Sequence, residues 1–179
     1  MVAQYLKNLH DSGCPRNLHN VTKSFLSKRW TTLQTNNIKV EAEIPRGCPK
    51  GSCCGPGLWN IFYNSLLNLN FTHRTKSIAF ANDLILETRG KSVIEAENIA
   101  HSELTKISAW ATDNKIRFNE RKSNIMLLSR RKRKERKDLD IYLNFRPLTQ
   151  VINLKYLGII LDSKLTFREH IKLHNGKMF

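Results

Sequence analysis

The sequence predicts an α+β fold, in which an antiparallel sheet has helices packed on one face. Three observations support this prediction. Helical apolar spacing and strand-like alternation are mixed irregularly, no unit of roughly 20 to 50 residues repeats, and no Ser/Pro-rich linker divides the chain. The 179 residues, 40% of them apolar, are enough to bury one core without requiring two independent domains.

Two helices are expected first. Apolar residues recur at helical spacing in the opening segment, namely at Val2, Tyr5, Leu6 and Leu9. Gly13, followed by Cys14 and Pro15, supplies the stop. Because no N-capping residue precedes this helix, we expect the chain to open within a larger domain or to begin with a disordered first turn. A second short helix is expected to carry Leu18, Val21 and Phe25.

A hairpin, a loop and a helix come next. In residues 38 to 44, I-K-V-E-A-E-I, apolar and charged side chains alternate strictly after the turn residues Asn36 and Asn37. This pattern predicts a hairpin with one wet face. Residues 45 to 54 form a loop that contains Gly and Pro. Pro56, at an expected first helical position, then opens a helix that carries Leu58, Ile61, Phe62 and Leu66.

The centre of the chain predicts a second hairpin and a long helix. Residues 77 to 81 and 84 to 88, S-I-A-F-A and L-I-L-E-T, are apolar runs separated by Asn82 and Asp83, which predicts a tight buried hairpin. Ser92 and Glu95 have the spacing of a capping box. The helix that they begin should end near Asn114. Its apolar stripe is formed by Ala96, Ile99, Ala100, Leu104, Ile107 and Trp110.

Three further strands are expected in the C-terminal half of the chain. They are N-I-M-L-L-S at residues 124 to 129, L-D-I-Y-L-N-F at residues 139 to 145, and N-L-K-Y-L-G-I-I-L-D at residues 153 to 162. The basic run R-R-K-R-K-E-R-K lies between the first two.

The charge and the cysteines limit the class of protein. A formal net charge of +15 predicts a polyanionic partner, and nucleic acid is the obvious one. No apolar run approaches the roughly 20 residues that cross a bilayer, so no membrane partner is expected. The N-terminus lacks signal-peptide features, which predicts a nuclear or cytoplasmic protein that is not secreted. The four cysteines form no C-x-x-C pair or regular disulfide framework and the six histidines are scattered, so a zinc site is not expected.

Phe80 to Leu84, F-A-N-D-L, is the sharpest candidate for chemistry. A carboxylate at the tip of a buried hairpin is rigidly held and partly dry, as metal-assisted phosphoryl transfer requires. An ordinary Asn-Asp turn is the alternative, and on these five residues alone it is the better interpretation.

A second candidate precedes it. Residues 46 to 52, R-G-C-P-K-G-S, are followed by G-P-G-L-W-N-I at residues 55 to 61. The glycines would let the backbone approach a nucleic acid closely, and a flexible loop that caps a helix is the alternative. Together the two segments resemble the G-x-P-Q-G-S loop and G-P-x-L-W-N-I helix of LINE-type reverse transcriptases.

Further motifs follow in the order in which that family has them. The family's (Y/F)-A-D-D hairpin is matched by residues 80 to 83, and its W-x-x-x-N-K-x-x-x-N-x-x-K-(S/T) motif by residues 110 to 123. K-Y-L-G-I-I-L-D, residues 155 to 162, is similar to the family's K-Y-L-G-x-x-L-D strand. The resemblance to the reverse transcriptase domain of non-LTR, LINE-like retrotransposons covers residues near 1 to 172.

The resemblance implies the fingers and palm of a right-hand polymerase over residues 1–162, and the start of a thumb or connection segment over residues 163–179. It implies RNA-directed DNA polymerisation, with an RNA template, a DNA primer and dNTP as partners and Mg²⁺ as cofactor. The implied catalytic positions are Asp83, Asn82 and Lys122, with Asp83 as the metal ligand. The implied template and nucleotide contacts are Gly47, Pro49, Lys50, Gly51, Ser52, Phe80 and Ala81, and the implied primer grip is Tyr156, Leu157 and Gly158.

The chain also departs from the family. Two-metal catalysis needs several carboxylates, and the family takes the first from an Asp motif before the loop, where this chain has only Asp11, in L-H-D-S-G-C-P. Asn82 replaces the first Asp of the hairpin with a neutral amide. Lys50 replaces Gln, with no consequence that we can assign. We therefore expect a truncated, decayed copy that does not polymerise DNA by itself.

Two other functions stay open at this point. The run from Arg130 to Lys137 is typical of a nuclear-import signal or a phosphate-binding patch, and equally of a solvated hairpin tip. The chain would then be a non-catalytic RNA- or DNA-binding module. Base stacking by the aromatic residues Tyr63, Phe71, Phe80 and Tyr156 is weighed against core packing, which is the better use of most of them. The last alternative is an unstable product of a degenerate reading frame with an unpaired sheet edge.

Overall fold

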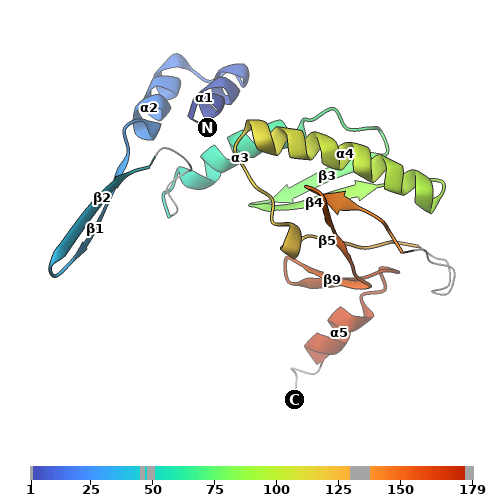
Figure 1. Ribbon diagram of the computed structural model, residues 1–179. Helices are drawn as coiled ribbons and strands as arrows, with labels where there is room; N and C mark the ends of the chain where they lie inside the picture. Colours follow the sequence, from blue (N-terminus) through green and yellow to red (C-terminus); the bar gives the residue numbers. More distant parts are fainter. Residues whose placement is uncertain (1, 45–46, 48–50, 130–137, 176–179) are drawn as a thin grey trace. The chain divides into compact units, whose positions relative to one another are not determined.

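The computed structural model describes residues 2–44, 47, 51–129 and 138–175 (Figure 1). Contacts divide the chain into two compact units. The first comprises Met1–Phe71, Lys76–Glu87 and Thr112–Ile116, and the second comprises Thr72–Thr75, Thr88–Ala111 and Arg117–Phe179. Helices and small sheets are mixed in both units, so the predicted α+β class is confirmed. No helix in the described part of the chain is long and apolar enough to cross a membrane.

The first unit has its core between the helices α1 (Val2–Asp11) and α3 (Gly55–Leu67). The ring centroids of Tyr5 and Phe62 lie 4.8 Å apart, and both side chains are buried. The amide of Asn8 donates to the backbone carbonyls of Ile61 and Phe62 at 3.3 and 3.5 Å. The helices predicted from the spacing of apolar residues are thus confirmed, and α1 is tied to α3 by both apolar and polar contacts.

The helix α2 (Arg16–Leu26) also forms where it was expected, but its apolar face is open. Leu26 is buried, whereas the predicted contact residues Leu18, Val21 and Phe25 are 53%, 65% and 42% exposed. The sequence pattern thus correctly predicted the helix and the side of it that is apolar. The described residues supply no cover for that side.

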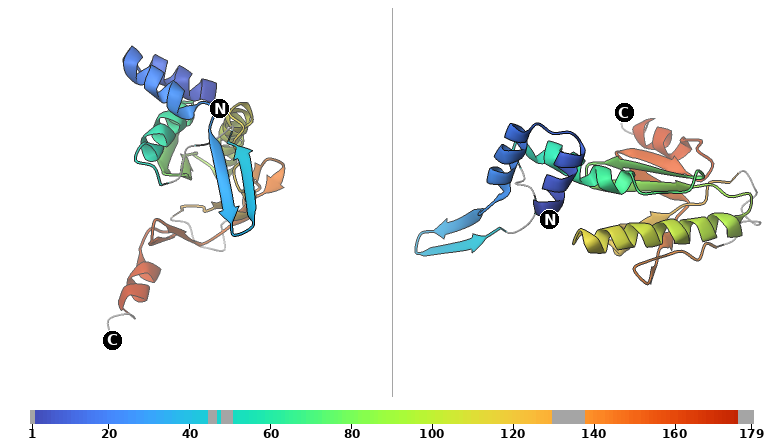
Figure 2. Two further views of the ribbon diagram at one scale, coloured as in Figure 1. Left: turned by 90° about the vertical axis from the view of Figure 1, so that its left-hand side faces the viewer. Right: turned by 90° about the horizontal axis from the view of Figure 1, so that it is seen from above.

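The strands β1 (Trp30–Thr35) and β2 (Ile38–Glu43) form the predicted antiparallel hairpin around Asn36 and Asn37. The register places Leu33 opposite Val40, so the apolar residues share one face. We expected only the other face to be wet, and this was wrong: every residue of both strands is exposed. The hairpin projects from the helices of its unit in Figures 1 and 2. Strict alternation of apolar and charged residues predicts a strand face that is able to pack. It does not predict which element would pack against that face.

The strands β3 (Thr75–Phe80) and β4 (Asp83–Thr88) pair as the second hairpin. The turn is Ala81 and Asn82, one residue earlier than expected, so Asp83 is the first residue of β4. We expected a buried hairpin. Instead its strands are half-buried and its tip is exposed, because one face of a two-stranded ribbon is left to solvent.

The long helix α4 (Val93–Asp113) ends one residue before the predicted position. Ala100, Ile107 and Trp110 of the predicted stripe are buried. The hydroxyl of Ser92 accepts the backbone N–H of Glu95 at 3.1 Å, as the capping box requires. The carboxylate of Glu95 accepts the backbone N–H of Lys91, one residue before the expected partner, and also pairs with Arg74.

The strands of the second unit are much shorter than predicted. Residues 124–129 contribute only β5 (Asn124–Ile125), which pairs in parallel with β8 (Thr149–Gln150). Residues 139–145 contribute β6 (Tyr142–Leu143), which pairs with β7 (Arg146–Pro147). Among the described residues every sheet is two-stranded, so the single antiparallel sheet that we predicted is not seen.

The segment of residues 153–162 is a hairpin, whereas we predicted one strand. Its strands are β9 (Asn153–Tyr156) and β10 (Ile159–Asp162), paired antiparallel. Leu157 and Gly158 between them have positive φ angles of 48° and 86°, which is the conformation of a tight hairpin turn. The apolar run concealed this turn because Leu157 occupies a position that usually carries Asn or Gly. The helix α5 (Arg168–Asn175) follows.

Candidate functional site

The turn between β3 and β4 is held by the helix α3. Ala81 has a φ angle of +50°, which is unfavourable for a residue with a side chain. The indole Nε1–H of Trp59 donates to the backbone carbonyl oxygen of Ala81 at 2.6 Å. This hydrogen bond fixes the turn against the helix. It leaves the adjacent residues Phe80, Asn82 and Asp83 exposed at the tip.

A second aromatic residue of α3 lies beneath the tip. Tyr63 stacks on Trp59 with ring centroids 5.1 Å apart, and its side chain is buried. Burial, together with the negative charge of Asp83, raises the pKa of Tyr63 to about 12. The phenol therefore stays protonated at neutral pH and is close enough to Asp83 to sense its charge. We weighed Tyr63 as a base-stacking residue, but it is part of the core.

Trp59 was missed as a site residue by sequence reasoning. Its spacing of four residues from Tyr63 places both rings on one side of α3, and that spacing was the available signal. The W-N-I motif therefore has a structural explanation here: the side chain of its tryptophan donates a hydrogen bond to the turn.

The donor atoms at the tip do not fit a pair of divalent metal ions. Asp83 is exposed, so the partly dry carboxylate that we expected is not present. Asn82 offers one neutral amide oxygen, and hard cations such as Mg²⁺ prefer charged oxygen ligands. No group of three or more His, Cys, Asp or Glu side chains in the described parts of the chain is placed to hold a metal ion. Asp11 ends α1, where it pairs with His10.

The loop before α3 is described only in part, because Pro49 and Lys50 lie outside the described residues. Gly47 and Gly51 have positive φ angles of 82° and 83°, so a side chain at either position would be strained. The hydroxyl of Ser52 accepts the backbone N–H of Gly55 at 3.0 Å. This contact fits the interpretation of the loop as a helix cap, and the implied nucleotide contact stays a prediction.

The remaining implied residues belong to the second unit. Lys122 is exposed in the short 3₁₀ helix η1 (Glu120–Lys122), where its backbone N–H is accepted by the side chain of Asn119 at 3.3 Å. Tyr156 ends β9, and its hydroxyl is buried without a hydrogen-bond partner among the described residues. Leu157 and Gly158 form the exposed turn after it. The basic run of residues 130–137 lies outside the described residues.

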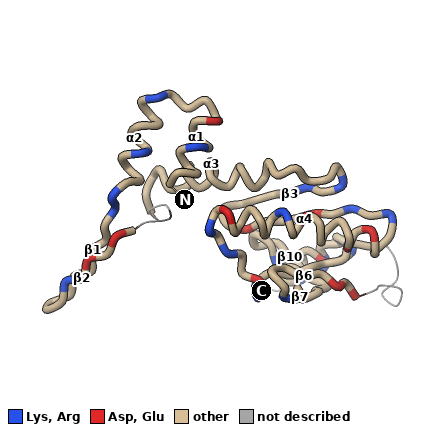
Figure 3. The backbone as a smooth tube through the Cα atoms, turned by 45° about the horizontal axis from the view of Figure 1, so that its top comes forward, with Lys and Arg blue, Asp and Glu red and all other residues tan. Residues whose placement is uncertain are grey.

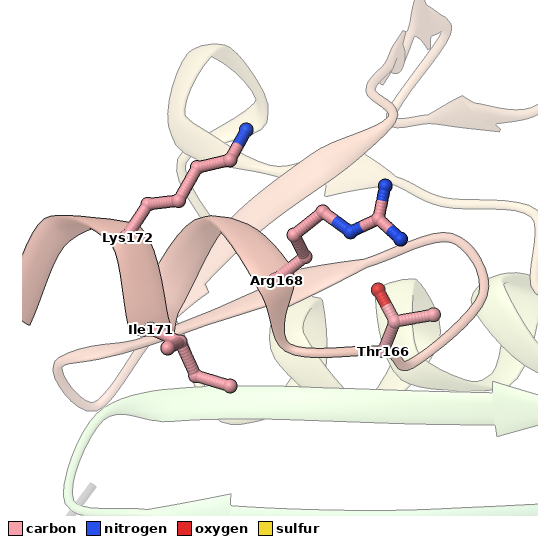
Figure 4. A pocket seen from close by; sticks show the side chains of 4 residues that line it. All are labelled: Thr166, Arg168, Ile171 and Lys172. Atoms are coloured by element: carbon pink, nitrogen blue, oxygen red, sulfur yellow. The ribbon is translucent and has the colours of Figure 1, made fainter. Parts of the chain in front are cut away.

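Two hollows open on the surface of the second unit. One, of about 470 Å³, is lined by Thr166, Arg168, Ile171 and Lys172, and Figure 4 shows that the two cationic side chains leave α5 on the side opposite to Ile171. The ammonium of Lys172 already pairs with Glu169 at 2.9 Å. The other, of about 340 Å³, is lined by Arg117, Phe118, Asn119, Glu120, Arg121 and Arg146. Figure 3 shows that Lys and Arg of the described residues occur in both units.

Comparison with known proteins gives a consistent picture. The family model described as reverse transcriptase (RNA-dependent DNA polymerase) matches residues 2–161. The chain is 31% identical over 166 residues to a 115 kDa protein in type-1 retrotransposable element R1DM of Drosophila melanogaster, which covers 93% of the chain and 16% of the relative. It is 30% identical over 168 residues to the RNA-directed DNA polymerase from mobile element jockey of the same species, which covers 88% of the chain and 18% of the relative. The chain thus spans less than a fifth of the length of these two relatives.

Proposed function

Because the chain belongs to the reverse transcriptase family, of the non-LTR, LINE-like kind, we propose that it forms fingers and palm elements that bind an RNA template, a DNA primer and dNTP. In this proposal residues 1–162 are the fingers and palm, and residues 163–179 begin a thumb or connection segment. The observation that carries it is the hairpin tip at residues 80–83, which Trp59 holds in place through Ala81. The site of action is the nucleus or the cytoplasm.

We further propose that the 179-residue chain by itself does not polymerise DNA. Asn82 and an exposed Asp83 provide one carboxylate at the tip, and two divalent ions about 4 Å apart require more negative charge than that. Among the described residues, no group of three or more His, Cys, Asp or Glu side chains could hold a metal ion. At this site the chain then supplies three features: the backbone geometry of the turn, the hydrogen bond from Trp59 and the neutral phenol of Tyr63.

Primer extension on a homopolymer RNA template with Mg²⁺ tests the second proposal. The purified chain and its Asp83→Ala variant should both give background incorporation, and Asn82→Asp alone should not restore activity. Magnesium-dependent incorporation by the unaltered chain that is lost in Asp83→Ala would overturn the proposal. Tyr142→Phe, an exposed change in the second unit, is the matched control for handling and folding.

A second candidate function is that of a non-catalytic nucleic-acid-binding module. The formal net charge of +15 favours it, because each phosphate neutralised by Lys or Arg releases a counterion. Binding that falls steeply with salt, without incorporation, would support it. A broad, non-cooperative unfolding transition of the isolated chain would instead support the unstable-product alternative.

A further inference from the structure

Phe145 is the most exposed large apolar residue of the described chain, and its backbone is strained. It lies in the turn between β6 and β7, and the residue has 101% of the reference exposure. Asn144 and Phe145 have φ angles of +50° and +63°. This turn usually takes Asn followed by Gly, because both central residues need positive φ. A phenylalanine at the second position pays a backbone cost and exposes an aromatic ring, and no described residue covers that ring.

The residues before Phe145 in this hairpin are firmly held, so the backbone that carries its ring has a fixed position. Ile141 and Leu143 are buried. The ring of His101 on α4 stacks on Tyr142, and its Nε2 hydrogen-bonds the backbone carbonyl of Asp140 at 2.7 Å. The hairpin therefore presents Phe145 from a fixed base. Local strain that the surroundings impose in this way is typical of ligand-binding positions.

The residues on either side of Phe145 reach the hollow of about 340 Å³ described above. Arg146 lines it directly. The amide of Asn144 donates to the carboxylate of Glu120 at 2.9 Å, and Glu120 also lines the hollow. This hydrogen bond, then a backbone hydrogen bond to the Glu120 carboxylate, and then the positive charges of Arg117 and Arg146 lower the pKa of Glu120. Glu120 is thus ionised at neutral pH and locks the turn onto η1.

Three arginine residues line this hollow. Arg117, Arg121 and Arg146 are exposed, and none of them forms an ion pair with a described carboxylate within 4.0 Å. With Glu120 ionised, the lining keeps a net charge of about +2, which attracts a phosphate. The hollow at α5 differs, because one of its two cations is already paired and no aromatic residue lines it.

We propose that Phe145, Arg117, Arg121 and Arg146 form a binding site for single-stranded nucleic acid. The Phe145 ring stacks on one unpaired base, and the guanidinium groups bind the neighbouring phosphates. A duplex hides the faces of its bases, so a ring at a hairpin tip reaches a base face only on a single strand. The site rests on the proposed function in one respect, which is that this chain binds nucleic acid. It is independent of polymerisation and of the β3–β4 hairpin.

Fluorescence anisotropy of the full chain with labelled 12-nucleotide probes tests this site. The probes are a single-stranded RNA, a single-stranded DNA of the same sequence, and the corresponding duplex. Phe145→Gly should weaken binding to a single strand by about tenfold, within the range given by base–aromatic stacking. Glycine suits the positive φ angle, so this variant should fold at least as well as the unaltered chain. A photoreactive iodouridine in the probe should crosslink to the peptide that contains Phe145, which a purely structural role would not produce.

The triple variant Arg117→Gln, Arg121→Gln, Arg146→Gln tests the phosphate contacts. The slope of log Kd against log salt should fall by about 2, because each phosphate contact to a single strand contributes about 0.7. The matched control is Lys7→Gln, Arg16→Gln, Lys23→Gln, which removes equal charge from exposed positions of α1 and α2. This control should lower the slope much less.

The outcomes separate the possible ligands. Binding of one single strand but not the other identifies RNA or DNA as the source, and either result supports the site. Equal affinity for the duplex, or unchanged affinity in both Phe145→Gly and the triple arginine variant, overturns it. If those variants bind normally while the unaltered chain still binds nucleic acid, the proposed function survives and this site does not. If the unaltered chain binds no probe, both fail.

Discussion

The hairpins β1–β2 and β3–β4 have strands of equal length and two-residue turns, yet they differ in what holds them. In β1–β2 the register brings Leu33 opposite Val40, and no residue of either strand is buried. In β3–β4 the strands are half-buried, and the turn is hydrogen-bonded by Trp59. The comparison separates the formation of a hairpin from its anchoring. Alternation and turn residues are enough to form a hairpin. Its anchoring depends on contact with a helix that is itself packed in the core.

The largest expected effect comes from removing the packing under the anchored hairpin. Phe62 is fully buried and lies between Tyr5 and Trp59. Phe62→Ala should lower the free energy of unfolding by about 3–5 kcal/mol, because a cavity adds to the lost burial. Urea denaturation followed by circular dichroism measures this change. A loss below about 1 kcal/mol would show that α3 is not the support of this unit.

The next effect is a loss of stability at alkaline pH. Folding raises the pKa of Tyr63 from 10.0 to about 12, so its neutral form is favoured in the folded state. The associated stability is complete below pH 10 and is lost as pH rises towards about 12, at roughly 1.4 kcal/mol per pKa unit. Denaturation across this pH range should show a loss that is absent in Tyr63→Phe. Asp83→Asn should lower the pKa of Tyr63 only in part, because burial is the larger cause, and tyrosinate absorbance would measure that change.

A smaller effect isolates the hydrogen bond to the turn. Trp59→Phe keeps an aromatic ring beside Tyr63 but removes the donor to Ala81, and it should cost about 1 kcal/mol. Amide exchange should become faster at the tip of β3–β4 and stay unchanged in β1–β2. Equal acceleration in both hairpins would mean that the hydrogen bond does not act locally.

The smallest effect is expected in the hairpin without an anchor. Leu33 is 72% exposed, so Leu33→Thr should change the free energy of unfolding by less than about 0.5 kcal/mol. The same urea experiment as for Phe62→Ala applies, with Phe62→Ala as the contrasting change. A loss of 2 kcal/mol or more would show that this strand face is covered in solution.

These contrasts also mark what the sequence was able to predict. The helices, the two long hairpins and the apolar stripe of α4 follow from spacing and turn residues, which are local signals. The degree of burial of β3–β4 could not be predicted from these local signals, because burial depends on neighbours far along the chain. The turn at Leu157 and Gly158 was missed because an apolar residue adopts a positive φ angle there.

The candidate site was predictable to a similar extent. The motifs located the tip at Asn82 and Asp83, and family membership confirms that kind of domain. Trp59 was missed because its role requires knowing which carbonyl lies opposite its indole. Phe145 was missed because an aromatic residue in a predicted strand is ordinary. Only its full exposure and positive φ angle set it apart.

The pairwise sheets also have a consequence for the order of folding. Four of the five strand pairs among the described residues join strands that are neighbours in the chain, so each closes a short loop and should form within about 1–10 μs. The parallel pair β5–β8 is different, because it must wait for the intervening segment to come together. Rates of compaction in the second unit should therefore follow this one long-range pairing. The early hairpins would form and unfold many times before Asn124 pairs with Thr149.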